Sequence, residues 1–360
     1  MNIKKFLQIS AFWLLMICCC FVTACSTQSA VTTTDNANTA PIETISPTDS
    51  VENTPLSESV TKPTLIPGPD AVLCDMPSNT YDTLSVPTQI TRIGDDFFLV
   101  DCYHNQILTS PSLDKPLTEW LVLTDNINRG HTIAGNGSIY VADDTENHRI
   151  LVFTKYNDCF YQTQIIESIG NRPHYVEYNP ITERFYVLSS MSSELYVFYQ
   201  DPASLELHQE KVLEIPNMDG VYIRSFTFID EYIYFATGIG IILRCDLDNL
   251  NVLEVWFLPN ELAGLVQIVK IDDYFYLTVS TDNTGNTDYA TIIRTKDLSL
   301  LENNQYEDLY TTFGGIGTPY YISSFDGHFF LTHHSYVPGN GVWQFEIADN
   351  ELHDVKALYP

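Results

Sequence analysis

Basic residues are scarce in this sequence, and the scarcity narrows the possible functions. The 360 residues include 17 Lys and Arg against 46 Asp and Glu, which gives a net charge of −29 at pH 7. Proteins that bind nucleic acid contact its phosphates with clustered Lys and Arg, so the composition argues against a nucleic-acid partner. It also argues against electrostatic docking on an anionic lipid surface.

Motifs that carry catalysis or cofactor binding are missing as well. The chain has no CxxC pair, which excludes zinc-knuckle and thioredoxin-like sites. It has neither a GxSxG nucleophile motif nor a Gly-rich phosphate loop between a strand and a helix. Nothing in the sequence therefore requires a cofactor, and nucleophilic catalysis has no support.

Cysteines are few in the part of the chain that can fold. Cys74, Cys102, Cys159 and Cys245 remain after the N-terminal segment is set aside, which is compatible with export but is not disulfide-dense. A Cys74–Cys102 bridge is one alternative, and four free or buried thiols are the other. We expect the free thiols.

The N-terminus has the pattern of an export signal. Lys4 and Lys5 precede an uncharged run over residues 6–24, which ends Val-Thr-Ala before Cys25. This arrangement resembles the bacterial lipobox, whose cysteine is acylated and becomes the first mature residue. The resemblance implies a signal peptide over residues 1–24 and a palmitate-bearing anchor at Cys25 on the extracytoplasmic face of the cell membrane. An ordinary secretory signal or a single membrane anchor is the alternative.

The next segment lacks aromatic residues altogether. Residues 26–69 contain 10 Thr, 6 Ser and 6 Pro. Such a composition buries too little apolar area to offset the entropy of ordering, so we predict a disordered linker over residues 25–69. The folded domain is then expected over residues 70–360.

That domain lacks any long stretch with helical period and consists of short apolar runs broken by Gly, Asn and Asp. One pattern, a turn followed by an aromatic-rich strand and a second apolar strand, recurs six times. Its anchor aromatics are Phe98, Tyr140, Tyr186, Tyr234, Tyr276 and Phe330. Repeats of 40–50 residues with several strands each are typical of propeller blades. We predict an all-β, six-bladed β-propeller; a sandwich, a barrel and a seven-bladed propeller are the alternatives. The place of residues 72–85 stays open.

The second copy carries a closer resemblance. Tyr140-Val-Ala-Asp143, followed by Asn147-His-Arg149 and an apolar run to Phe153, is similar to the NHL repeat of six-bladed propellers. The other copies keep the strands and turns but not the polar core of that repeat. Asp143, Asn147 and Arg149 are accordingly expected to form structural hydrogen bonds within the blade.

A propeller places the starts of its innermost strands around one mouth of a central channel. Counting back from each anchor gives a polar residue in every unit: Gln89, His131, His174, Arg224, Gln267 and Tyr321. We predict that these six converge as a ligand-binding site, with His131 and His174 as the metal ligands if a metal binds. A water-filled polar channel is the alternative. For Arg224 we expect an ion pair, with a ligand carboxylate as the second possibility.

Two functions remain open. The first is a monomeric, membrane-anchored binding module for a glycan, peptide or protein, with no catalytic residues. The second is a metal-dependent propeller enzyme, lactonase-like or lyase-like, with its site on the channel. The second rests on fold resemblance alone, so we favour the binding module.

Overall fold

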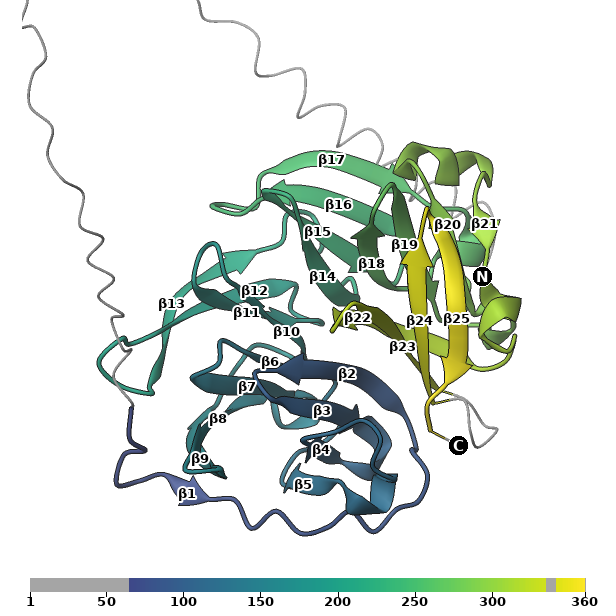
Figure 1. Cartoon of the computed structure of the whole chain (residues 1–360). Helices are drawn as coiled ribbons and strands as arrows, with labels where there is room; N and C mark the ends of the chain where they lie inside the picture. The colour runs from purple at the N-terminus through teal and green to yellow at the C-terminus, as the bar shows by residue number, and fades with distance from the viewer. Residues whose placement is uncertain (1–64, 335–340, 360) are drawn as a thin grey trace, which may run out of the picture. The chain divides into compact units, whose positions relative to one another are not determined.

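The computed structural model describes residues 65–334 and 341–359, which belong to a unit spanning Lys62–Pro360 (Figure 1). The predicted signal peptide, the acylation site Cys25 and nearly all of the predicted linker lie outside the described residues. Within those ranges, no helix has the length and apolar character needed to cross a membrane.

Six antiparallel sheets make up this unit, which confirms the predicted six-bladed β-propeller. Blade 1 contains β2 (Pro87–Ile93), β3 (Asp96–Asp101), β4 (Gln106–Ser110) and β5 (Leu121–Thr124). Blade 2 contains β6 (Ile133–Gly135), β7 (Ile139–Asp144), β8 (Arg149–Tyr156), β9 (Cys159–Ile166) and β1 (Val72–Leu73). Blade 3 contains β10 (Pro173–Asn179), β11 (Arg184–Ser189), β12 (Glu194–Gln200) and β13 (Leu207–Glu214).

The second half of the chain repeats the arrangement. Blade 4 contains β14 (Ile223–Ile229), β15 (Tyr232–Thr237), β16 (Ile241–Asp246) and β17 (Val252–Phe257). Blade 5 contains β18 (Leu265–Ile271), β19 (Tyr274–Val279), β20 (Thr291–Thr295) and β21 (Glu307–Asp308). Blade 6 contains β22 (Thr318–Phe325), β23 (His328–His334), β24 (Val342–Ala348) and β25 (Glu351–Ala357). Short 3₁₀ helices lie between strands: η1 (Cys102–His104), η2 (Leu117–Glu119), η3 (Thr145–Asn147), η4 (Asn260–Leu262), η5 (Thr287–Tyr289), η6 (Leu298–Asn303) and η7 (Tyr310–Phe313).

Burial explains why the aromatic-rich runs form the middle strands. β7 is buried at every residue, and β11 at all but its first, because neighbouring blades cover both faces of each sheet. The outermost strands β17 and β25 are exposed at most positions. Each blade therefore grades from apolar middle strands to a solvated edge.

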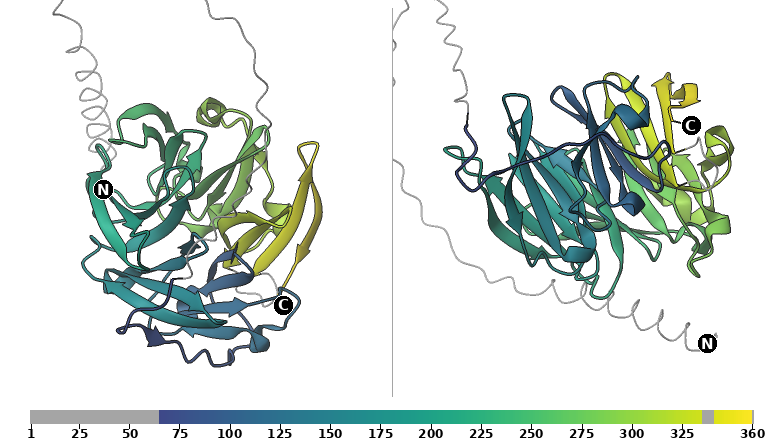
Figure 2. Two further views of the ribbon diagram at one scale, coloured as in Figure 1. Left: turned by 60° about the vertical axis from the view of Figure 1, so that its left-hand side comes forward. Right: turned by 90° about the horizontal axis from the view of Figure 1, so that it is seen from below.

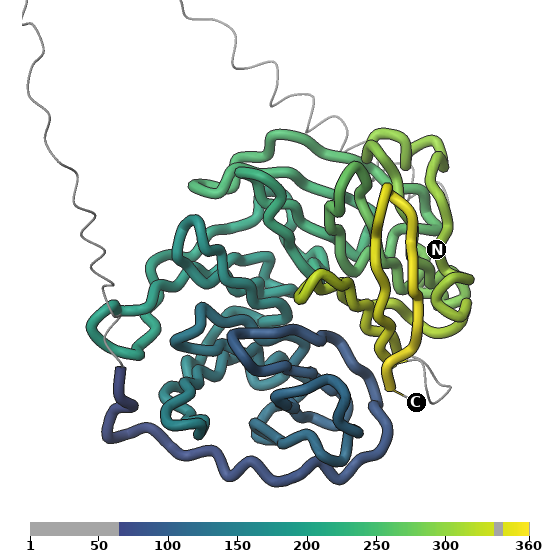
Figure 3. Tube along the Cα trace, in the orientation of Figure 1, coloured from purple at the N-terminus to yellow at the C-terminus, as the bar shows by residue number. Residues whose placement is uncertain are grey.

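The first strands of successive blades contact one another around the channel, and the ring closes between β22 and β2 (Figure 2). Blade 6 joins blade 1 through side chains rather than a shared strand. Thr332 donates a hydrogen bond to the carbonyl oxygen of Thr88 at 2.6 Å, and Arg92 pairs with Asp326. The tube in Figure 3 shows this meeting of the early and late parts of the chain.

Residues 72–85, whose place the sequence left open, run along the outer edges of two blades. β1 pairs with β9 and gives blade 2 a fifth strand, and Ser78 then pairs with Leu121 on the edge of blade 1. Exposed sheet edges are sites of aggregation, so this segment protects the two edges that it covers.

The anchor aromatics all lie on the second strands of their blades and pack between blades, as predicted. One alignment detail is wrong. Asp101 and Asp144 each end a strand before a 3₁₀ turn, so Val141, rather than Tyr140, occupies the position of Phe98. The ring of Tyr140 accordingly packs back against Phe98 of blade 1, 5.3 Å between centroids. Aligning the repeats on their aromatic residues does not reveal that blade 2 is shifted by one residue. Such a shift places the aromatic side chain on the other face of the strand.

Candidate functional site

In blades 3 and 4, a β-bulge near the start of the innermost strand determines which side chain points into the channel mouth. The register shifts between Pro173 and Tyr175 in β10 and between Ile223 and Ser225 in β14. His174 and Arg224 are the extra residues, and a bulge turns such a side chain away from the regular ladder. These two residues therefore lie at the channel mouth, at matching positions of blades 3 and 4.

His131 takes the matching position in blade 2, just before β6. Its backbone N–H and that of Thr132 both donate to the Asp143 carboxylate, at 3.0 and 2.7 Å. Gly130 makes this approach possible, because a Cβ there would lie 2.6 Å from the Asp143 carbonyl oxygen. The NHL-like turn thus holds His131 in place through its backbone.

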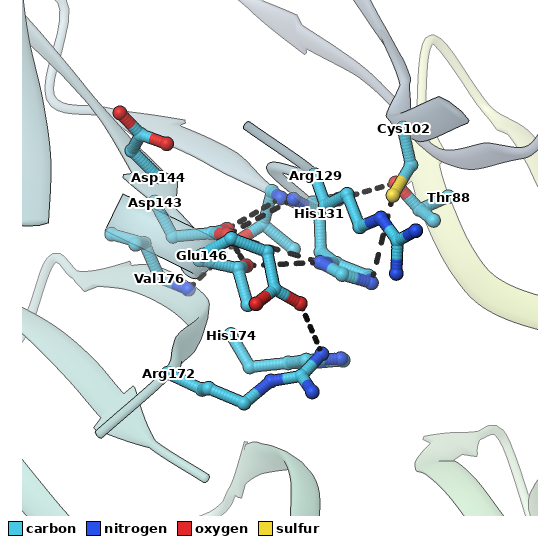
Figure 4. A network of polar contacts seen from close by, with 12 residues as sticks. Thr88, Cys102, Arg129, His131, Asp143, Asp144, Glu146, Arg172, His174 and Val176 are labelled. Atoms are coloured by element: carbon cyan, nitrogen blue, oxygen red, sulfur yellow. Dashed lines mark hydrogen bonds and ion pairs between the residues drawn. The ribbon is translucent and has the colours of Figure 1, made fainter. Parts of the chain in front are cut away.

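The three matching residues meet across blades. The rings of His131 and His174 stack with centroids 3.8 Å apart (Figure 4). His174 Nδ1 lies 3.0 Å from the Arg224 carbonyl oxygen, and its Nε2 lies 2.8 Å from the Tyr222 hydroxyl. The carbonyl can only accept, so Nδ1 carries a proton and donates to it. When the ring is neutral, Nε2 accepts from the Tyr222 hydroxyl.

Electrostatics keeps both imidazoles neutral. Burial, together with the positive charges of Arg172 and Arg224, lowers the pKa of His131 to about 3. Burial and the neighbouring His131 and Arg224 hold the pKa of His174 well below its ordinary value. The pair is therefore uncharged at pH 7.

Three of the eight arginines of the chain, Arg129, Arg172 and Arg224, lie close enough to influence His131, and Figure 4 shows the first two. Six of the eight form ion pairs with an acid: Arg92, Arg149, Arg172, Arg184, Arg244 and Arg294. Arg129 and Arg224 have no acidic partner among residues 65–334 and 341–359, and both belong to the mouth. The ion pair expected for Arg224 is therefore not found in the described part of the chain.

Aromatic rings accompany the unpaired guanidinium groups. Arg224 lies over the Tyr222 ring at 5.3 Å, and Arg129 over the Tyr103 ring at 5.2 Å. The Nε atom of Arg224 is inaccessible and has no hydrogen-bond partner in the described structure. Tyr321 closes the mouth from blade 6, with its hydroxyl 3.3 Å from both His174 Nδ1 and the Arg224 carbonyl oxygen. We call Arg129, His131, Arg172, His174, Tyr222, Arg224 and Tyr321 the arginine mouth.

Gln89 and Gln267, the other two predicted site residues, lie one position beyond the bulge and bond to the next blade. Gln267 accepts from the N–H of Ile322 at 2.6 Å and donates to the carbonyl oxygen of the same residue at 3.3 Å. Gln89 accepts from the N–H of Ile133 at 2.7 Å. Their amides clamp first strands together across blade interfaces.

Asn147 and Arg149 form the structural hydrogen bonds expected of the NHL-like repeat, but the acid that accepts them is Asp144 rather than Asp143. Asp144 accepts from Arg149 Nε at 2.7 Å and from Asn147 Nδ2 at 2.9 Å. Asp143 bonds instead to the turn that holds His131, and burial raises its pKa to about 6. Asp144 thus stabilises the turn after β7, whereas Asp143 holds the backbone of His131 at the mouth.

The four described cysteines are free, so the Cys74–Cys102 bridge is absent and the expected thiols are confirmed. The Cys102 Sγ lies 3.8 Å from His131 Nε2, and burial raises the thiol pKa, so Cys102 is a packing residue rather than a nucleophile. His131 Nδ1 lies 3.1 Å from the Thr145 hydroxyl. No group of three or more His, Cys, Asp or Glu that could hold a metal occurs in the described ranges.

Comparison with known proteins supports the architecture. The NHL-repeat family model matches residues 132–153, which include the Asp143 and Asp144 networks. No curated protein matches the chain.

Among solved structures, a candidate 6-phosphogluconolactonase from Bacteroides uniformis has 12% identity, covering 74% of this chain and 83% of its own, with a TM-score of 0.53. A streptogramin B lyase has 12% identity, covering 79% and 86%, with a TM-score of 0.52. Likeness at this identity concerns the fold.

Sequence reasoning missed Arg129, Arg172 and Tyr222 as members of the mouth. Each stands two residues before one of the three matching residues, in Arg129-Gly-His131, Arg172-Pro-His174 and Tyr222-Ile-Arg224. Repetition of a basic or aromatic residue at that spacing in three consecutive repeats is the signal that could have identified them.

Proposed function

We propose that this protein is a binding module whose arginine mouth takes a ligand bearing a carboxylate group. The observation that carries the proposal is the pair of arginines without acidic partners, Arg129 and Arg224, in a chain where the other six are paired. Acids outnumber bases 46 to 17, so an arginine with no acidic partner is unexpected unless another anion occupies the position.

The chemistry of the mouth favours a carboxylate joined to a ring or an apolar group. A guanidinium binds a carboxylate through two parallel hydrogen bonds, and the terminal nitrogens of Arg224 can donate both, because Arg224 forms no ion pair within the described residues. Tyr222 offers a ring face beside it, suited to stacking on a sugar ring or an apolar side chain. The neutral imidazoles of His131 and His174 add no charge that would compete with the arginines.

Catalysis is the weaker alternative for this site. Three of the four imidazole nitrogens of His131 and His174 lie within 3.3 Å of a protein oxygen, and the fourth faces the Cys102 thiol. The lactonase and lyase named above share the fold at 12% identity, which says nothing about shared chemistry. No observation favours an enzyme over a binding module.

We also propose that acyl chains on Cys25 hold the protein at the outer face of a bacterial membrane as a monomer. The support is the lipobox-like sequence before Cys25 and the Ser/Thr/Pro-rich segment after it. Such an arrangement would present the arginine mouth to ligands outside the cell.

Calorimetric titration of the full chain in mild detergent tests the binding proposal. Glucuronate is paired with neutral glucose, and triglycine with its C-terminal amide, so that each pair differs by one carboxylate. We expect binding of the acid and not of its neutral partner. The pair that responds identifies a uronic acid or a peptide C-terminus as the source of the carboxylate.

Matched variants assign the binding to the mouth. Arg224→Gln is expected to weaken binding about tenfold or more, as loss of a charge-assisted hydrogen-bond pair does. Arg184→Gln removes the same charge from an ion pair with Glu210 on blade 3 and should leave binding unchanged. Equal binding by wild type and Arg224→Gln, or no difference between acid and neutral probes, would overturn the proposal.

A further inference from the structure

The two ends of the propeller differ in the apolar side chains that their loops expose. In each blade, the loop before the first strand and the loop between the second and third strands lie at the end that carries the arginine mouth. Among the described residues, these loops expose five large apolar side chains, by 38 to 55% each: Tyr103, Met191, Ile239, Tyr289 and Ile316. Within the same described ranges, the loops at the opposite end expose one, Ile181. We call the five residues the apolar rim.

The apolar rim adjoins the arginine mouth on blades 1 and 3. The Tyr103 ring lies 5.2 Å from the guanidinium carbon of Arg129. The N–H of Met191 donates to the carbonyl oxygen of Asn171 at 3.0 Å, and Asn171 directly precedes Arg172. Both rim residues are therefore held within a residue of an arginine of the mouth.

Blade 4 repeats this arrangement. The N–H of Gly238 donates to the carbonyl oxygen of Tyr222 at 2.8 Å, and Ile239 is the next residue in the chain. The loop packs closely here, because a Cβ on Gly238 would lie 3.2 Å from that carbonyl oxygen. The apolar rim and the arginine mouth are thus parts of one surface.

The charge around the mouth restricts the kind of anion that can bind. Asp125, Asp219 and Asp288 are exposed in loops at the same end of the propeller, and the chain as a whole has a net charge of −29. A polymer of uronic acids would place most of its carboxylates against this acidic surface and would be repelled. A ligand with one carboxylate at its end, and neutral or basic groups behind it, avoids that repulsion.

The shape of the rim side chains favours a peptide over a sugar as the body of the ligand. Sugar rings stack on flat aromatic faces, whereas Met191, Ile239 and Ile316 are aliphatic. Aliphatic side chains pack on the apolar side chains of a polypeptide, and methionine adapts its shape to them. Exposed apolar residues gathered around a polar centre are typical of a surface that binds another chain.

We infer that the ligand is a polypeptide whose free C-terminal carboxylate binds at the arginine mouth and whose preceding apolar side chains pack on the apolar rim. This inference rests on the carboxylate binding proposed above and names the source of that carboxylate. The mouth recognises the charged end of the chain, and the rim selects apolar residues next to it. The acidic surroundings favour a terminus without further acids.

Calorimetric titration of the full chain in mild detergent with acetylated tripeptides separates these contributions. Acetyl-Gly-Leu-Leu and acetyl-Gly-Ser-Ser have the same terminal carboxylate, and the amide of acetyl-Gly-Leu-Leu lacks it. We expect the Leu peptide to bind about tenfold or more tightly than the Ser peptide, because its side chains bury apolar surface. The amide should bind about tenfold or more weakly than the acid. Acetyl-Lys-Leu-Leu should bind more tightly than acetyl-Glu-Leu-Leu.

Matched variants assign the apolar contribution to the rim. Ile239→Ser and Met191→Ser should each weaken binding of acetyl-Gly-Leu-Leu roughly threefold or more and leave glucuronate binding unchanged. Ile181→Ser makes the same kind of change at the opposite end of the propeller and should affect neither ligand. All three side chains are exposed, so the variants are expected to fold.

The outcomes distinguish this inference from the proposed function. If glucuronate binds but the Leu and Ser peptides bind equally, or the amide binds as well as the acid, the peptide inference is overturned and the carboxylate site stands. Wild-type binding of acetyl-Gly-Leu-Leu by both Ile239→Ser and Met191→Ser would also overturn it. If no acid binds better than its neutral partner, the proposed function fails and the inference fails with it.

Discussion

The imidazole rings of His131 and His174 stack at 3.8 Å although they belong to different blades. The contact exists because each residue lies at the same point of its blade, one before β6 and the other at the bulge of β10. Stacking between adjacent blades brings two neutral rings and the neighbouring arginines to one side of the channel mouth. The mouth is therefore asymmetric, built mainly by blades 2 to 4, with Tyr321 of blade 6 closing it.

The neutral state of His131 predicts loss of stability in acid. Its pKa is about 3 in the fold and about 6.5 in an unfolded chain, so below pH 6.5 the unfolded state binds more protons. The free energy of unfolding should fall by about 1 to 2 kcal/mol for this group between pH 6.5 and 5. Urea unfolding of His131→Gln should show a weaker loss than wild type.

The control for this experiment is His208→Gln, which removes a histidine on the surface of blade 3. It should follow the wild-type pH dependence. If His131→Gln and wild type lose stability in parallel below pH 6.5, the buried neutral imidazole is not the cause.

A second prediction separates clamp residues from ligand contacts. Gln267→Leu leaves the N–H and carbonyl of Ile322 without partners and should lower the free energy of unfolding by about 1 to 3 kcal/mol. Gln209→Leu, on the exposed face of β13, should change it by no more than about 0.5 kcal/mol. Glucuronate binding by Gln267→Leu should be unchanged. A loss of binding with normal stability would show that Gln267 contacts the ligand.

Much of the architecture could be predicted from the sequence because a propeller repeats. Six copies of one strand pattern indicated six blades, and the burial of middle strands on both faces explains why the pattern is so apolar. The Tyr140 register could not be predicted in this way. It depends on where the 3₁₀ turn after Asp144 begins, which aromatic spacing does not record.

The site was partly predictable for a similar reason. His131, His174 and Arg224 were identified by their place in the repeat, but so were Gln89 and Gln267, which bond across blades instead. The two kinds of residue occupy neighbouring positions of the innermost strand, and the bulge determines which of the two side chains points into the mouth.

A third prediction concerns the N-terminus. Cys25→Ser removes the sulfur that would carry the acyl chain, so the protein should leave the membrane fraction or accumulate unprocessed. Palmitate labelling and membrane fractionation measure this. Ser26→Cys beside an intact Cys25 serves as a control and should stay in the membrane. Unchanged labelling of Cys25→Ser would contradict the anchor.

Nuclear magnetic resonance of the arginine side chains tests the arginine mouth most directly. In the full chain labelled with ¹⁵N-arginine, the Nε–H signal of Arg224, assigned with Arg224→Gln, is followed during addition of glucuronate and of triglycine. Our account predicts that the Arg224 signal shifts with the acid that binds and stays still with glucose or the amidated peptide, while the Arg184 signal does not move. An unmoved Arg224 signal at saturating acid would contradict it.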